Sequence, residues 1–166
     1  MTTTPLPHTQ AQPATRVLST VALIRLITEI DDHGAIPARG MSATFPDLSR
    51  HALRQAVTRA QTLGLIVRSP HGIGLTDTGR DLADLYDTIA RWARRHHYPA
   101  PSGTFTDRIR HTLRLISEPT AHGDAQDGVV VTGNTRLDVH EPQEALARWI
   151  AVHERQLYQS DCELAA

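Results

Sequence analysis

The chain has 166 residues and a mass of 18.3 kDa, which is the size of one ordinary domain. Hydrophobic residues make up 40% of it and charged residues 21%, so it can build a buried core. No stretch approaches the ~18 consecutive apolar residues of a membrane span. The single cysteine, Cys162, excludes an internal disulfide and a zinc cluster of cysteines. The N-terminus lacks the charged and apolar regions of a signal peptide, so we expect a soluble cytoplasmic protein.

The net charge of −1 conceals two segments of opposite charge. Residues 34–115 contain 12 Arg and 6 Asp, whereas residues 116–166 contain 3 Arg and 9 acidic residues. Within the basic segment, Leu48–Thr76 holds four Arg and no acidic residue. Like charges repel, so such a stretch is typical of a surface that meets a polyanion, most often nucleic acid. A solvated face without a partner is the alternative.

The first third of the chain predicts a tail and two helices. Residues 1–14 are rich in Thr and Pro and lack apolar periodicity, so we expect a disordered tail. Apolar residues then recur at helical spacing from Val17 to Ile30, which predicts one helix ended by Gly34. A brief extended piece over 35–37 and a short helix over 38–45 are expected to follow.

The clearest element is a helix that begins after Ser49 and ends at Gly64. A serine hydroxyl at this position can accept a hydrogen bond from a free amide of the first turn. Glycine ends a helix readily because it tolerates positive φ. One apolar stripe within about 80° is expected to be buried: Leu53, Ala56, Val57, Ala60 and Gly64. A small hairpin follows, with strands over 65–68 and 73–75.

The remainder predicts further helices and a second hairpin. A helix capped by Thr76 is expected to run to about His97, and a linker over 99–103 follows it. The next elements are a helix over 105–116 and a hairpin of 129–131 with 137–139. The chain is then expected to end with a helix over 141–158 and a tail over 159–166.

Four short segments of this arrangement carry a family resemblance. They are Leu48–Leu53 at the start of the basic helix, Leu63–Ile66 between helix and hairpin, Leu75–Arg80 with the pattern L-T-x-x-G, and Trp92–His97 at the end of the long helix. Over residues 16–97 the chain resembles the winged helix-turn-helix DNA-binding regulators of the MarR and HxlR types. The resemblance implies a mainly α fold with a small β wing, and a DNA-binding domain over residues 15–98. Residues 104–158 are expected to form a helix-hairpin-helix extension for oligomerisation or effector response.

The exposed side of the basic helix supplies the candidate DNA contacts. An α-helix fits the major groove, where Arg can bond guanine and Gln can bond adenine in a bidentate manner. Arg54 and Gln55 are therefore the predicted base contacts, and Arg59 and Arg68 the predicted phosphate contacts. The complete predicted set is Arg50, His51, Arg54, Gln55, Thr58, Arg59, Arg68 and His71, the last at the wing tip.

Enzyme signatures are missing from the sequence. The ten His show no H-E-x-x-H or other helical metal spacing, and neither G-x-x-x-x-G-K-[ST] nor G-x-S-x-G occurs. We therefore expect no catalysis, cofactor or metal. The predicted function is a sequence-specific regulator of transcription that binds double-stranded DNA, expected to be a repressor. A winged-helix adaptor that binds proteins, and a plasmid or phage replication or partition protein, are the alternatives.

A homodimer is expected, because two copies double the contacts with a palindromic site. The predicted seams are the helix around Tyr86–Trp92 and the last helix, where Leu146, Ile150, His153 and Leu157 follow a 4-3-4 spacing. The alternative is that the last helix folds back on its own core. No residue identifies a small-molecule effector.

Overall fold

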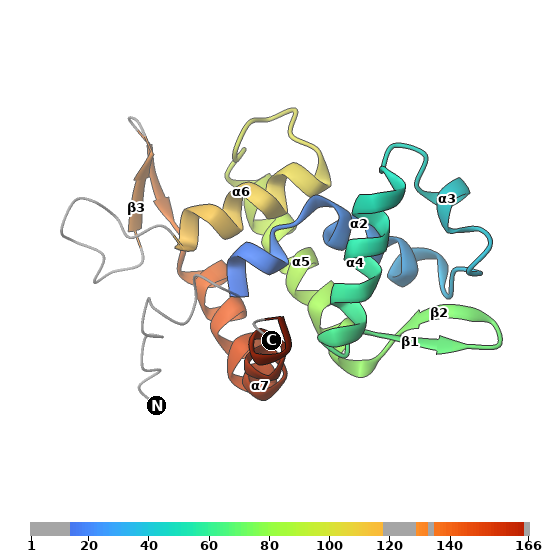
Figure 1. Cartoon of the computed structure of the whole chain (residues 1–166). Coiled ribbons are helices and arrows are strands. Elements are labelled where there is room, and N and C mark those ends of the chain that lie inside the picture. The colour runs from blue at the N-terminus through green and yellow to red at the C-terminus, as the bar shows by residue number, and fades with distance from the viewer. Residues whose placement is uncertain (1–13, 118–128, 133–134, 165–166) are drawn as a thin grey trace. The chain divides into compact units, whose positions relative to one another are not determined.

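The computed structural model describes residues 14–117, 129–132 and 135–164 (Figure 1). These residues are mainly helical and form two separate antiparallel sheets of two strands each. Among the described residues, no helix combines the length and the apolar character needed to cross a membrane. The expected combination of helices with small β hairpins is therefore confirmed.

The chain forms two compact units. One, called the α4 unit, comprises Thr20–Asp84 and the chain from His153 onward. The other, called the α6 unit, comprises the chain up to Ser19 and Leu85–Val152. The sequence predicts a boundary at residues 99–103, between domains 15–98 and 104–158. The observed division between the two units falls instead within one continuous helix. The reason is that the second half of that helix bonds to residues of the α6 unit, as described below.

The elements of the α4 unit follow one another in a simple order. They are α2 (Val21–His33), α3 (Met41–Thr44), α4 (Arg50–Thr62), β1 (Ile66–Ser69), β2 (Gly72–Leu75) and the first half of α5 (Asp77–Arg95). The predicted basic helix and the predicted hairpin are confirmed to within two residues at their ends. The predicted short helix is present as the four residues of α3.

The predicted single helix from Val17 to Ile30 is wrong, because the chain is interrupted at Thr20. Residues 14–18 form a first helical segment, which Ser19 closes by donating from its hydroxyl to the Arg16 carbonyl oxygen at 3.2 Å. Thr20 has extended dihedrals, φ −70° and ψ 123°, and α2 begins at the next residue. Of the expected disordered tail, Ala14 is helical and buried, and residues 1–13 lie outside the described residues.

The core of the α4 unit lies between α2, α4 and β2. Helix α2 packs against both of the other elements. Ala56 and Ala60 of α4 are buried, and their small side chains allow the two helices to approach closely. Ile36 adds a short extended segment, because its N–H and carbonyl oxygen both bond to Ile73 of β2, at 3.0 and 2.9 Å. The extended piece predicted at 35–37 is thus joined to the hairpin.

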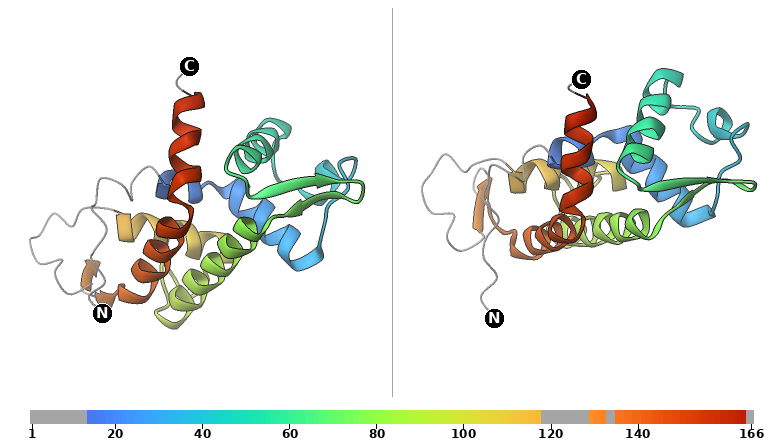
Figure 2. Two further views of the ribbon diagram at one scale, coloured as in Figure 1. Left: turned by 90° about the horizontal axis from the view of Figure 1, so that it is seen from below. Right: turned by 60° about the horizontal axis from the view of Figure 1, so that its bottom comes forward.

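Strands β1 and β2 form a tight hairpin beside α4 (Figure 2). Ser69 is opposite Gly72, so Pro70 and His71 form the turn. The Ser69 hydroxyl oxygen accepts from the His71 N–H at 3.2 Å and donates to the Gly72 carbonyl oxygen at 3.2 Å. This local network fixes the turn as predicted from the sequence.

Thr76 joins three elements at one hydroxyl group. Its Oγ1 donates to the carbonyl oxygen of Gly64 at 2.6 Å and accepts from the N–H of Gly79 at 3.1 Å. Gly64, at φ 65°, ends α4 in the left-handed conformation. A Cβ atom on Gly79 would lie 2.1 Å from the Leu65 carbonyl oxygen, so only glycine fits there. The pattern L-T-x-x-G therefore has a physical cause in the junction of α4, β2 and α5.

The α6 unit contains the second half of α5, together with α6 (Phe105–Ser117), β3 (Val129–Thr132), β4 (Thr135–Asp138) and the first part of α7 (His140–Leu164). The predicted helix and the predicted second hairpin are confirmed, although the turn at 133–134 lies outside the described residues. Helix α7 continues to Leu164, so the expected tail from Gln159 is helical over residues 159–164.

Two buried aromatic residues of α5 hold the α6 unit together. The hydroxyl of Tyr86 donates to the Leu18 carbonyl oxygen at 2.7 Å, and the indole N–H of Trp92 donates to the Asp138 carbonyl oxygen at 2.8 Å. Burial raises the pKa of Tyr86 above its ordinary range, which keeps the hydroxyl protonated as a donor. These bonds explain why the second half of α5 belongs to this unit.

The residues predicted to form a dimer seam are already buried within the single chain. Tyr86 and Trp92 are at most 1% exposed, and Leu146 and Ile150 are at most 4% exposed. His153 is buried in the α4 unit with its Nε2 3.2 Å from Oδ2 of Asp81. The predicted seam is therefore wrong for these five residues, because periodicity identified the apolar faces but not what covers them. The side chain of Leu157 lies outside the described residues.

We expect the substitution Gly79→Ala to lower the free energy of unfolding by about 1–3 kcal/mol, because the new methyl group would overlap the Leu65 carbonyl oxygen. Gly74→Ala is the matched control, since its Cβ would meet only the Ala35 side chain at 3.8 Å. Urea unfolding followed by circular dichroism measures both variants. Equal midpoints for the two would contradict the tight junction at Gly79.

We expect Tyr86→Phe to lower the free energy of unfolding by about 1–3 kcal/mol, because the buried Leu18 carbonyl oxygen loses its donor while the ring is retained. Thermal unfolding followed by circular dichroism measures the effect. A variant as stable as the wild-type protein would show that this hydrogen bond adds nothing to the α6 unit.

Candidate nucleic-acid interface

Helix α4 has a buried side and a polar side, and its first turn is set by Ser49. This residue is extended at φ −64° and ψ 148°, and its hydroxyl oxygen accepts from the Ala52 N–H at 3.1 Å. The predicted cap is confirmed. Leu53, Ala56 and Ala60 are buried, which leaves the opposite side of the helix in solvent.

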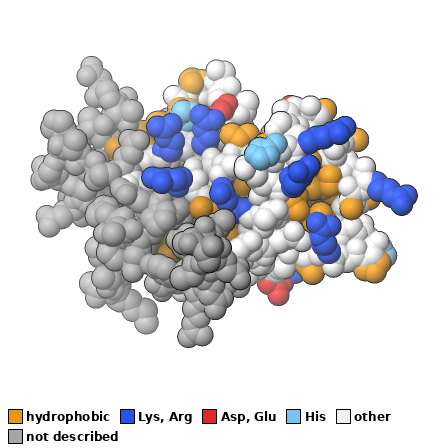
Figure 3. Space-filling model, viewed as in Figure 1, with side chains coloured by type: hydrophobic (Ala, Val, Ile, Leu, Met, Phe, Trp, Pro, Cys, Tyr) orange, Lys and Arg blue, Asp and Glu red, His pale blue; other side chains and the backbone are white. Residues whose placement is uncertain are grey.

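A groove of ≈ 340 Å³ runs beside α4. Three parts of the α4 unit line it: the segment around α3, one side of α4, and the hairpin. The lining residues are Ala38, Met41, Ser42, Arg50, Leu53, Arg54, Val57, Thr58, Gln61, Arg68 and Ile73. None of these eleven residues is acidic. Figure 3 shows basic side chains gathered around apolar atoms over α4 and the hairpin.

The groove brings together half of the predicted DNA-binding set. Arg50, Arg54 and Thr58 line it from α4, and Arg68 lines it from β1. These residues come from separate elements, so their meeting at one surface depends on where the hairpin lies.

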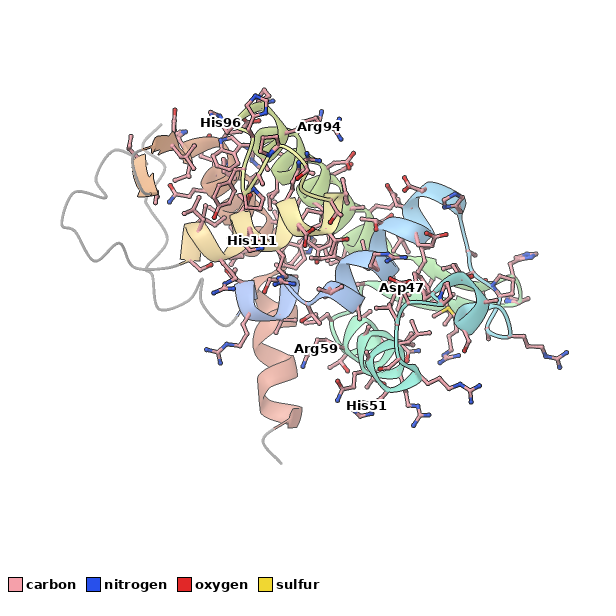
Figure 4. All side chains as sticks on the ribbon, turned by 90° about the horizontal axis from the view of Figure 1, so that it is seen from above. Asp47, His51, Arg59, Arg94, His96 and His111 are labelled. Carbon is pink, nitrogen blue, oxygen red and sulfur yellow. The ribbon has the colours of Figure 1, made fainter. Side chains whose placement is uncertain are left out.

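The other half of the predicted set lies outside the groove. His51, Gln55 and Arg59 belong to α4, and His71 belongs to the hairpin turn. All four are exposed. Figure 4 shows His51 and Arg59 projecting from different sides of α4. They are available to a ligand, but not as part of the groove.

Two groove residues of α4 that reach the surface, Val57 and Gln61, were not among the predicted contacts. Val57, expected to be fully buried, is only half-buried and lines the groove, because it lies at the edge of the apolar stripe. Gln61 also lines the groove and is exposed. It follows Arg54 by seven residues, or two helical turns, so the helical period could have placed it on the same side.

The arginines of the groove carry uncompensated charge. Within the described part of the chain, no ion pair involves Arg50, Arg54 or Arg68. Elsewhere, Arg80 pairs with Asp77 at 2.5 Å, and Arg95 pairs with Glu141. Three cations without an ion-pair partner among the described residues therefore lie at one groove beside α4.

The acidic residue nearest to α4 in the sequence is held by another cation. Arg25 of α2 donates to Oδ2 of Asp47 at 2.5 Å. This hydrogen bond lowers the pKa of the Asp47 carboxyl group. Asp47 is therefore ionised but paired, and it leaves the arginines of the groove uncompensated.

The histidines offer no metal centre in the part of the chain that the structure describes. No group of three or more His, Cys, Asp or Glu side chains there could hold an ion. His96 instead packs against Trp92 with ring centroids 4.7 Å apart, and Nε2 of His153 lies 3.2 Å from Oδ2 of Asp81. The chemistry available at the groove is therefore charge, hydrogen bonding and apolar contact.

Comparison with protein-family models, with curated proteins and with solved structures finds no match to the chain.

Proposed function

We propose that the α4 unit is a winged helix-turn-helix module that binds double-stranded DNA, and that the protein is a sequence-specific regulator of transcription. The observation that carries the proposal is the groove beside α4, which gathers unpaired arginines from a helix and a hairpin and has no acidic lining residue. A surface of this charge is stabilised by a polyanion.

The order of elements supports the same proposal. Helix α2, the extended residue Ile36, helices α3 and α4, the hairpin and α5 follow one another as the resemblance to MarR-type and HxlR-type regulators implies. In such a module α4 is the recognition helix and the β1–β2 hairpin is the wing. Both contribute to one groove, which is what simultaneous contact with a duplex requires.

The side chains on the groove suit the two kinds of DNA contact. Arg54 lies in the middle of the α4 face and can bond the O6 and N7 atoms of guanine. Arg50 lies in the first turn of α4, and Arg68 lies on the wing. Their guanidinium groups fit phosphate oxygens, which give affinity without sequence preference. Arg59, outside the groove, stays a predicted phosphate contact.

Assembly and regulation stay predictions. A homodimer would need a surface other than the buried faces of α5 and α7 described above. Repression, and a location in the cytoplasm, remain expectations from the sequence alone.

We expect binding to duplex DNA to weaken steeply with salt. Each phosphate contact adds roughly 0.9 to the slope of log affinity against log salt. Fluorescence anisotropy of a labelled duplex, measured over a salt series, gives the slope. Arg59→Ala should lower affinity for all sequences alike and flatten the slope by about one contact. Arg148→Ala, which removes the same charge from the α6 unit, is the control. Affinity that does not change with salt would overturn the electrostatic basis of the proposal.

We expect Arg54→Ala to change sequence preference rather than general affinity. Loss of one bidentate base contact should cost about 1–3 kcal/mol on the preferred sequence and little on random DNA. The preferred sequence is first obtained by selection from a random duplex pool with the purified protein, and both duplexes are then titrated. Equal losses on the two would demote Arg54 to a phosphate contact.

A further inference from the structure

The floor of the groove is apolar, although its rim is charged. Met41, Leu53 and Ile73 form it with buried side chains, and Val57 contributes its half-exposed side chain. Because the first three belong to the buried core of the α4 unit, the apolar surface open to a ligand is mainly that of Val57. Apolar surface left in water is unfavourable, so an occupant with an apolar group at this place gains free energy by covering it.

Charge complementarity favours duplex DNA as the occupant, and this step rests on the proposed function. Arg50, Arg54 and Arg68 line the same groove without an ion-pair partner among the described residues. The occupant is therefore anionic at its edges and apolar near its centre. In the major groove of DNA, the apolar group is the 5-methyl group of thymine.

Two neighbouring positions of α4 match the two bases of an A·T pair. Val57 and Gln61 are four residues apart, one helical turn, and both line the groove. The side-chain amide of Gln61 forms no hydrogen bond with another described residue and is exposed. A glutamine amide can bond N6 and N7 of adenine, and an aliphatic side chain can contact the thymine methyl group.

We propose that the groove side of α4 reads A·T pairs, with Val57 against a thymine methyl group and Gln61 bonded to adenine. Arg54, three residues before Val57, reads a neighbouring guanine. This assignment replaces Gln55 by Gln61 as the adenine-binding glutamine, because Gln55 lies on the same helix but outside the groove.

Uracil substitution tests the thymine contact on the unaltered protein. Each thymine of the selected duplex is replaced in turn by deoxyuridine, which removes only the 5-methyl group. We expect a loss of affinity of about three- to fivefold at one or two positions, the effect of one buried methyl group. Val57→Ser, which removes both methyl groups of the side chain, should bring the ratio between thymine and uracil duplexes close to one.

The two glutamines of α4 provide a matched pair for the adenine contact. Gln61→Ala should lower affinity for the selected duplex by about tenfold and relax the preference for A·T at one position. Gln55→Ala removes the same side chain from the same helix and should leave that preference unchanged. Circular dichroism spectra check that each variant is folded.

The outcomes separate this inference from the function on which it rests. If the wild-type protein binds no duplex, the proposed function fails and the inference fails with it. A second outcome is that the protein binds a selected sequence with an affinity that uracil does not change at any position, and that Gln61→Ala and Gln55→Ala have equal affinities. The DNA-binding function then stands, and the reading of A·T pairs is wrong.

Discussion

The hydroxyl group of Thr76 fixes the junction on which the groove beside α4 depends. It joins the Gly64 carbonyl oxygen at the end of α4 to the Gly79 N–H in the first turn of α5, while the hairpin leaves and returns between these residues. The absence of a side chain on Gly79 lets α5 approach the Leu65 carbonyl oxygen. The hairpin consequently leaves the unit next to α4, and Arg68 meets the arginines of the helix at one groove.

Local signals in the sequence were sufficient for most elements of the α4 unit. A cap or a turn depends on residues within a few positions of one another, so Ser49, Gly64 and Thr76 could be interpreted directly. The apolar period likewise placed Leu53, Ala56 and Ala60 on the buried side of α4. These elements fixed which side chains α4 exposes, and all eight predicted contact residues are indeed exposed.

The position of the groove depends on packing between residues far apart in the sequence, which the helical period does not predict. The exposed side of α4 spans a wide arc, and only the position of the hairpin, bonded through Ile73 to Ile36, determines which part of it borders the groove. The helical period could place Gln61 on the side of Arg54, but it could not show that this side borders a groove or that Val57 reaches its surface. The interruption of the helix at Thr20 was not predicted for a related reason. Apolar residues on both sides of Thr20 are buried, so the helical period continues across the break. In the same way, the spacing of Leu146 and Ile150 predicted a buried face of the helix, but not which residues pack against it.

The aromatic residues of the chain have a spectroscopic consequence. Both tryptophans, Trp92 and Trp149, belong to the α6 unit and are at most 5% exposed, whereas the α4 unit contains no indole. Intrinsic tryptophan fluorescence therefore follows the environment of the α6 unit, while far-ultraviolet circular dichroism sums the helices of both. The two signals trace the same unfolding curve only if the units melt as one cooperative block. The natural distribution of chromophores thus allows the independence of the α4 unit to be measured without any label.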